Sequence, residues 1–141
     1  MEFPINVLLV EDDEVDVMNM RRALKRKQLS VPLQVARNGL DALTLLQDSA
    51  AAAFRRKRQL VLLDLNMPKM GGLEFLGALR QDPDLRCLPV VAMTTSDDPA
   101  DRRQAYQLNV AGYVLKPVKF AEFADRIETL VRYWSYCEMP K

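Results

Sequence analysis

The chain has 141 residues, of which 49% are hydrophobic and 28% are charged, and its formal net charge is +1. This length suits one domain with a substantial core, and the balanced charge creates no field that would draw the chain to nucleic acid or to a membrane surface. No apolar run is long enough to cross a membrane, and the N-terminus lacks the basic region and cleavage site of a secretory signal. We therefore expect one cytoplasmic domain over residues 1–141.

The residue types that are missing restrict the chemistry. The chain contains no histidine, and its two cysteines, Cys87 and Cys137, are too far apart for a metal-binding CxxC pair. Ser-His-Asp triads, histidine-based zinc sites and a phosphohistidine on this chain are thereby excluded. Any reaction must depend on carboxylates, lysine, hydroxyl groups and a borrowed metal ion.

Short apolar runs and amphipathic segments alternate along the chain. Such runs are typical of strands buried on both faces of a parallel sheet. The predicted strands cover residues 5–10, 33–36, 60–63, 89–93 and 112–115. The predicted helices cover about 14–27, 40–46, 73–80, 98–108 and 119–136. This five-fold βα alternation predicts an α/β fold, a doubly wound parallel sheet with helices on both faces.

The first predicted helix is amphipathic, and residues 49–59 are the least informative stretch. The helix places Val15, Met18, Ala23 and Leu24 among arginines and lysines, and its acids precede its bases, which suits the helix dipole. The segment 49–59 either extends the second helix or forms a basic loop.

Polar side chains follow the strands where each strand ends. Glu11, Asp12 and Asp13 follow the first strand, and Asp64 follows the third. Thr94 and Lys116 follow the fourth and fifth strands, in the same way. Because the carboxyl ends of parallel strands meet at one edge of the sheet, we expect these side chains to lie close together.

Carboxylates at such short range repel one another unless one binds a proton or a dication lies between them. Mg²⁺ suits oxygen ligands and retains several waters, which leaves room for a phosphoryl group. A carboxylate beside Mg²⁺ and a lysine is a plausible phosphoryl acceptor. Asp13 is as well explained as a helix cap as by a place near the metal.

Four motifs of the chain resemble those of response-regulator receiver domains. They are LLVEDD (8–13), LLDLNMP (62–68), PVVAMTT (89–95) and GYVLKP (112–117), and the resemblance extends over nearly the whole chain. It implies a flavodoxin-like (βα)5 fold with strand order 2-1-3-4-5. It also implies that Asp64 is the phospho-acceptor and that Mg²⁺, for which Mn²⁺ or Ca²⁺ could substitute, is held by Glu11, Asp12, Asp64 and the Asn66 carbonyl.

The same resemblance assigns roles to residues of the last two strands. Thr94 would bond a phosphoryl oxygen, Lys116 would pair with the phosphate, and Tyr113 would be the aromatic switch that follows Thr94. The family usually has a cis peptide at the position of Lys116–Pro117. One departure is Gly71, where many receivers carry an acid; this affects helix capping and loop flexibility rather than chemistry.

A finer resemblance concerns possible partners. The long segment before the third strand, the TTSDD run (94–98) and the C-terminal YW…MP (133–140) are similar to small regulators that partner bacterial and cyanobacterial phytochromes. This implies a sensor histidine kinase, of the bacteriophytochrome type, as phosphoryl donor. It also implies a homodimer built through the C-terminal side. If exposed, the aromatic residues near the end of the last helix, Tyr133, Trp134 and Tyr136, would make a sizeable apolar patch, so we expect the dimer contact there, together with the helix over 98–108.

The main hypothesis is a stand-alone phosphorylation switch without an output domain, which catalyses only its own phosphorylation and dephosphorylation. The first alternative is a receiver fold used as a scaffold without phosphorylation. A phosphatase with an aspartate nucleophile would need an acid two residues after Asp64, where Asn66 stands. A nucleotide-binding domain would need a GxGxxG or GKS/T loop after the first strand, and the chain has neither.

Overall fold

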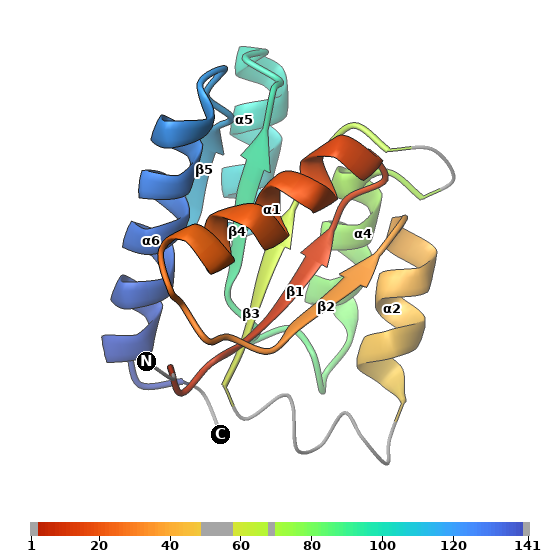
Figure 1. The fold of residues 1–141 in the computed structure, drawn as a ribbon. Coiled ribbons are helices and arrows are strands. Elements are labelled where there is room, and N and C mark those ends of the chain that lie inside the picture. Colours follow the sequence, from red (N-terminus) through yellow and green to blue (C-terminus); the bar gives the residue numbers. More distant parts are fainter. Residues whose placement is uncertain (1–2, 49–57, 68–69, 140–141) are drawn as a thin grey trace.

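The computed structural model describes residues 3–48, 58–67 and 70–139, which form a three-layer α/β fold (Figure 1). The strands are β1 (Asn6–Val10), β2 (Leu33–Ala36), β3 (Gln59–Leu63), β4 (Val90–Thr94) and β5 (Gly112–Leu115). They pair in parallel in the order β2-β1-β3-β4-β5, which confirms the expected flavodoxin-like sheet. The predicted strand boundaries are correct to within one residue.

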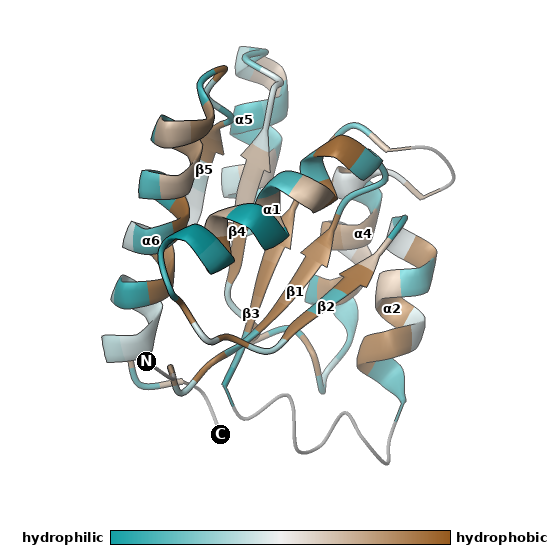
Figure 2. Ribbon diagram, in the orientation of Figure 1, coloured by the Kyte–Doolittle hydropathy of each residue, from teal (hydrophilic) through white to brown (hydrophobic). Residues whose placement is uncertain are grey.

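Helices cover both faces of the sheet. They are α1 (Glu14–Arg26), α2 (Gly39–Gln47), α4 (Gly72–Gln81), α5 (Pro99–Gln107) and α6 (Phe120–Tyr136). One buried cluster joins the sheet to α2, α4 and α5, and the other joins it to α1 and α6. The three central strands, β1, β3 and β4, are largely apolar (Figure 2), because their side chains on both faces lie in a core.

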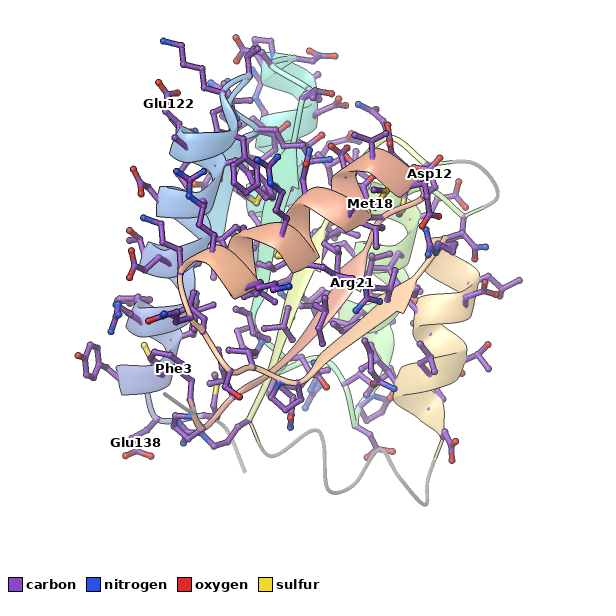
Figure 3. The ribbon with its side chains drawn as sticks, viewed as in Figure 1. Phe3, Asp12, Met18, Arg21, Glu122 and Glu138 are labelled. Carbon is purple, nitrogen blue, oxygen red and sulfur yellow. The ribbon has the colours of Figure 1, made fainter. Side chains whose placement is uncertain are left out.

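The buried face of α1 differs from the one that the sequence suggested. Val17, Met20, Ala23 and Leu24 are buried, whereas Val15 and Met18 are 63% and 62% exposed. Residues 17, 20 and 24 share one helix face at a spacing of three and four, and residues 15 and 18 fall outside it. Figure 3 shows Met18 on α1, in front of the sheet.

Basic side chains link elements that lie far apart in the sequence. Lys27, after α1, pairs with Asp125 of α6 at 2.6 Å. The Arg58 guanidinium, at the start of β3, donates to the backbone carbonyls of Pro4, Ser135 and Cys137. Helix α2 ends at Gln47. The segment 49–59 was expected to extend this helix or to form a basic loop; residues 49–57 lie outside the described residues, and Gln59 begins β3 instead.

The expected cis peptide between Lys116 and Pro117 is wrong: the described residues contain no cis peptide bond. The expectation came only from the resemblance, and a trans X–Pro bond is favoured intrinsically by roughly 0.5–1 kcal/mol. No helix in the described residues is long and apolar enough to cross a membrane.

Candidate functional site

The polar residues that the sequence placed at strand ends meet at one edge of the sheet. Backbone hydrogen bonds extend the ladder by one residue beyond the strands. Asp64 N–H donates to the Val10 carbonyl at 3.0 Å, and Lys116 N–H donates to the Thr94 carbonyl at 2.9 Å. Glu11 is held in the same way by the carbonyl of Ala36, at 2.9 Å. The sheet therefore fixes the backbone of each of these side chains.

Three carboxylates form the centre of the site. Glu11, Asp12 and Asp64 each offer an oxygen, and these oxygens lie within 4.8 Å of one another. Glu11 is 1% exposed and Asp64 7% exposed, whereas Asp12 is exposed and lies near the start of α1 (Figure 3). Asp13 caps α1 by accepting from the N–H of Val15 at 2.8 Å, so its capping role is confirmed.

Lys116 supplies positive charge to this cluster. Its Nζ lies 2.5 Å from a Glu11 oxygen, 2.9 Å from an Asp16 oxygen and 3.8 Å from an Asp64 oxygen. Burial raises the pKa of the Glu11 carboxyl to about 7, although the Lys116 ammonium opposes this rise. Burial alone would lower the pKa of Lys116, but its hydrogen bonds to Glu11 and Asp16 and the nearby carboxylate charges raise it. Lys116 is therefore a stable cation here.

Asp16 is a site residue that the sequence reasoning missed. An acid in the first turn of a helix is already explained by the helix dipole, so Asp16 carried no separate signal. Its partner Lys116 lies 100 positions away in the sequence, so no local pattern pointed to the pair. The structure adds Asp16 to the group around Lys116.

The three carboxylates fit a divalent cation. Their oxygens are close enough to share one ion, and two of them are buried, where uncompensated negative charge is costly. Asn66 is exposed just beyond Asp64, and its N–H donates to an Asp64 oxygen at 3.4 Å. This contact keeps the Asn66 backbone next to the acidic cluster.

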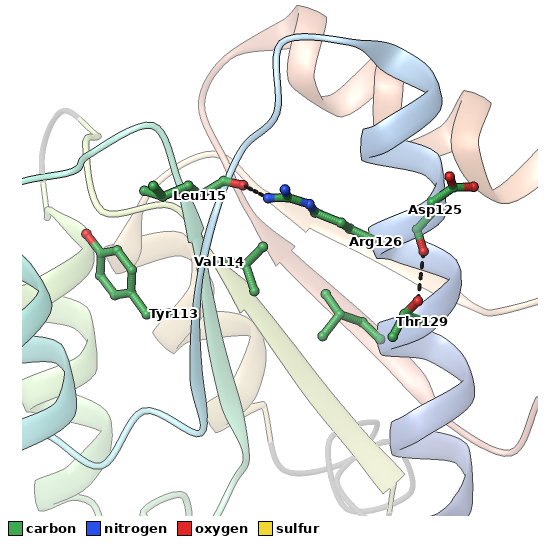
Figure 4. Close-up of a pocket in the computed structure, with 7 residues that line it drawn as sticks. Tyr113, Val114, Leu115, Asp125, Arg126 and Thr129 are labelled. Atoms are coloured by element: carbon green, nitrogen blue, oxygen red, sulfur yellow. Dashed lines mark hydrogen bonds between the residues drawn. The ribbon is translucent and has the colours of Figure 1, made fainter.

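Thr94 and Tyr113 are linked through the loop after β4. Thr94 is fully buried, and its hydroxyl oxygen accepts from the N–H of Ser96 at 3.2 Å. The Tyr113 hydroxyl donates to the Ser96 carbonyl at 2.9 Å. Tyr113 also lines a pocket of about 530 Å³ between β5 and α6, where Arg126 donates to the Leu115 carbonyl (Figure 4). The position of the Tyr113 ring is thus coupled to the loop that carries Ser96.

This arrangement agrees with a comparison against known families. The model of the response regulator receiver domain matches residues 7–128. The chain belongs to the response-regulator receiver family. Receivers are phosphotransfer and switch proteins, controlled by phosphorylation, rather than classical enzymes.

Several relatives of this receiver match over most of their own length. The probable methanogenesis regulatory protein FilR2 of Methanothrix harundinacea is 35% identical over 94% of this chain and 85% of its own. Response regulator Rcp1 of Synechocystis sp. is 34% identical over 93% of this chain and 89% of its own. This receiver is therefore similar in extent as well as in sequence to these response regulators.

Solved structures match the receiver closely. The phosphorylated cyanobacterial phytochrome response regulator RcpA has a TM-score of 0.86 at 28% identity, covering 97% of this chain and 99% of its own. The Mn²⁺-bound form of Rcp1 has a TM-score of 0.83 at 32% identity, covering 98% and 100%. A relative with the same fold thus holds a divalent metal, which agrees with the acidic cluster of this receiver.

Proposed function

We propose that Asp64 of this receiver accepts a phosphoryl group from the phosphohistidine of a sensor histidine kinase. An Asp64 carboxylate oxygen attacks phosphorus, the P–N bond breaks, and its electron pair returns to the imidazole of the kinase. The observation that carries this proposal is a carboxylate that is 7% exposed, next to two further acids and 3.8 Å from a lysine ammonium.

We propose Mg²⁺ as the resident cation, with Mn²⁺ or Ca²⁺ as substitutes. Glu11, Asp12, Asp64 and the backbone carbonyl of Asn66 would hold it. When bound, the cation supplies charge neutralisation for the oxygens of the transferring phosphoryl group. The oxygen-only donor set of this cluster supports a hard cation over zinc or copper.

The remaining residues have roles in holding the phosphoryl group and reporting its presence. The Thr94 hydroxyl would donate to one phosphoryl oxygen, and the Lys116 ammonium would pair with another. Thr94 would then pull on the loop that carries Ser96, to which Tyr113 is hydrogen-bonded. A shift of that loop would change the Tyr113 rotamer and the surface around β5, which is a two-state switch.

The test uses a kinase that has been labelled on its histidine with radioactive phosphate from ATP. Wild-type receiver should take up the label in the presence of Mg²⁺, and Asp64→Asn should not. Because Asp64→Asn keeps the size of the side chain, its circular dichroism spectrum should match that of the wild type. Retained labelling of the folded variant would place the acceptor elsewhere.

We further propose a phytochrome-type kinase as the partner, acting on this chain in the cytoplasm. Two similar structures support this: the cyanobacterial phytochrome response regulator RcpA, and a response regulator in red light signaling of R. palustris, which has a TM-score of 0.82 at 27% identity. Phosphotransfer should be fastest from a bacteriophytochrome kinase when a panel of kinases is compared at short times. Faster transfer from a kinase without a photosensory domain would contradict this partner.

We also propose a homodimer that uses the C-terminal half of α6, together with α5. Tyr133 and Tyr136 are 58% and 84% exposed, and Trp134 packs partly against the core with its ring 5.3 Å from that of Tyr133. Tyr106 of α5 is also half exposed. Large aromatic side chains gathered at one helix end favour a protein contact.

A further inference from the structure

Lys116 is shared by carboxylates from three separate elements. Glu11 follows β1, Asp64 follows β3, and Asp16 belongs to α1. The Lys116 ammonium is 2.5 Å from Glu11 and 2.9 Å from Asp16, but 3.8 Å from Asp64. In this structure the ammonium therefore bonds to the two acids that are not the proposed acceptor. To pair with a phosphoryl group on Asp64, it must weaken at least one of these bonds.

The three carboxylates differ in the other interactions that they can make. Glu11 and Asp64 belong to the cluster whose oxygens can share a cation, and Asp16 lies outside that cluster. A cation bound by Glu11 would neutralise much of the negative charge of Glu11 and so weaken its attraction for Lys116. The Asp16 carboxylate would then be the remaining competitor for the ammonium.

The burial of this pair makes the competition significant. The Lys116 side chain is 10% exposed and the Asp16 side chain 34% exposed, so water screens their attraction only in part. The neighbouring acids of the same turn interact with groups other than Lys116. Asp13 caps α1, and Glu14 pairs with Arg37 at 2.5 Å on the exposed surface.

We propose that Asp16 is a positioning residue. Its carboxylate binds the Lys116 ammonium in the unphosphorylated receiver and competes for this ammonium with the phosphoryl group on Asp64. This inference rests on the proposed phosphorylation of Asp64. Asp16 acts only through Lys116 and touches neither the acceptor nor the phosphoryl group. Its carboxylate lowers the tendency of the receiver to become phosphorylated, because every phosphorylation event must draw Lys116 away from it.

The first experiment compares phosphorylation rates of wild type and Asp16→Asn, measured by intact mass with acetyl phosphate at saturating Mg²⁺. Asparagine keeps the size of the side chain and removes its charge. We expect phosphorylation to become faster by about three- to tenfold, the range that a partly buried ion pair can account for. The matched control is Glu14→Gln, which removes one negative charge from the same turn without touching Lys116, and its rate should stay within about twofold of the wild type.

A double-mutant cycle tests whether Asp16 acts through Lys116. On a Lys116→Met background, which phosphorylates slowly, Asp16→Asn should change the rate by less than about twofold. Three results would each overturn the proposal: a rate in Asp16→Asn that is unchanged or lower, an equal gain in Glu14→Gln, or an undiminished gain without Lys116.

A spectroscopic measurement separates this proposal from the proposed function. In protein labelled with ¹⁵N-lysine, the Nζ signal of Lys116 is identified by its absence in Lys116→Met. Asp16→Asn should shift this signal in the unphosphorylated receiver, and Glu14→Gln should not. An unshifted signal in Asp16→Asn overturns the proposal even if Asp64 is phosphorylated. If the wild type takes up no phosphoryl group, the proposed function fails, and the competition for a phosphoryl group is overturned with it. In that case a shifted Lys116 signal establishes only a structural ion pair between Asp16 and Lys116.

Discussion

At the scale of single residues, the site balances buried negative charge against one ammonium. Glu11 and Asp64 are both almost fully buried, and removing charged groups from water is expensive unless opposite charge lies close by. Lys116 provides that charge, with its Nζ 2.5 Å from Glu11 and 3.8 Å from Asp64. Its loss should therefore affect both stability and phosphorylation.

Replacing Lys116 with methionine should lower the free energy of unfolding by about 1–3 kcal/mol in EDTA, because buried acids lose their counter-ion. The rate of phosphorylation by acetyl phosphate should fall by roughly ten- to a hundredfold, since a charge-assisted hydrogen bond to the phosphoryl group is lost. Urea unfolding and intact-mass kinetics measure the two effects.

The matched control for this variant is Lys119→Met, three residues further along the chain. Lys119 is exposed before α6, so its loss should change neither quantity by much. A Lys116→Met protein phosphorylated at the wild-type rate would contradict the role of Lys116.

At the scale of elements, glycines let α2 and α4 approach the segment that follows β3. A Cβ on Gly39 would lie 2.8 Å from the Met70 Cγ and 2.8 Å from the Phe75 Cβ, and the Gly39 N–H donates to the Met70 carbonyl at 3.0 Å. A Cβ on Gly72 would lie 2.5 Å from the Asp64 carbonyl oxygen. These contacts are far too short, so both positions require glycine for packing around the proposed acceptor.

Gly39→Ala should destabilise the fold by about 1–3 kcal/mol, the usual cost of overpacking. It should also slow phosphorylation, because Met70 follows the Asp64 loop and would have to move. Gly77→Ala is the matched control within α4: a Cβ at this position would have no neighbour within 4 Å among the described residues, and alanine should stabilise the helix by up to about 1 kcal/mol. Thermal unfolding of both variants checks the pair, and equal stability would contradict the packing account.

The helices and strands also differ in how well the sequence predicts them. The strands and the order of charged residues at their ends were predictable, because buried parallel strands are continuous apolar runs that end in polar residues. The buried face of α1 was not, because Val15 and Met18 are apolar yet 63% and 62% exposed, and periodicity alone does not tell which apolar stripe meets the sheet. The Asp16–Lys116 pair was also out of reach, since it joins residues 100 positions apart.

At the scale of the whole molecule, the helix layer formed by α1 and α6 on one face of the sheet carries exposed aromatic side chains. They lie in the C-terminal turns of α6, where Tyr133 and Tyr136 are exposed. Trp134 packs against the core of that face, so it contributes to folding as well as to any contact. The two tyrosines are therefore the better positions at which to test the proposed dimer.

The double variant Tyr133→Ser, Tyr136→Ser should shift the molecular mass in solution from dimer to monomer, because it removes exposed aromatic area without opening the core. Light scattering after size-exclusion chromatography measures this. Leu40→Ser is the control: Leu40 is 54% exposed on α2, across the sheet from α6, and its replacement should leave the mass unchanged. A tyrosine variant that keeps the wild-type mass would rule out this contact.

The proposed switch depends on Asp64 accepting a phosphoryl group with the help of a divalent cation. The most direct measurement is intact mass after treatment with acetyl phosphate, first with Mg²⁺, then with EDTA, and then with Asp64→Asn. We predict the gain of one labile phosphoryl group in the wild type with Mg²⁺ and no gain in the other two. A wild type that gains none, from acetyl phosphate and from a labelled histidine kinase alike, would contradict the account and favour a receiver fold that serves as a scaffold.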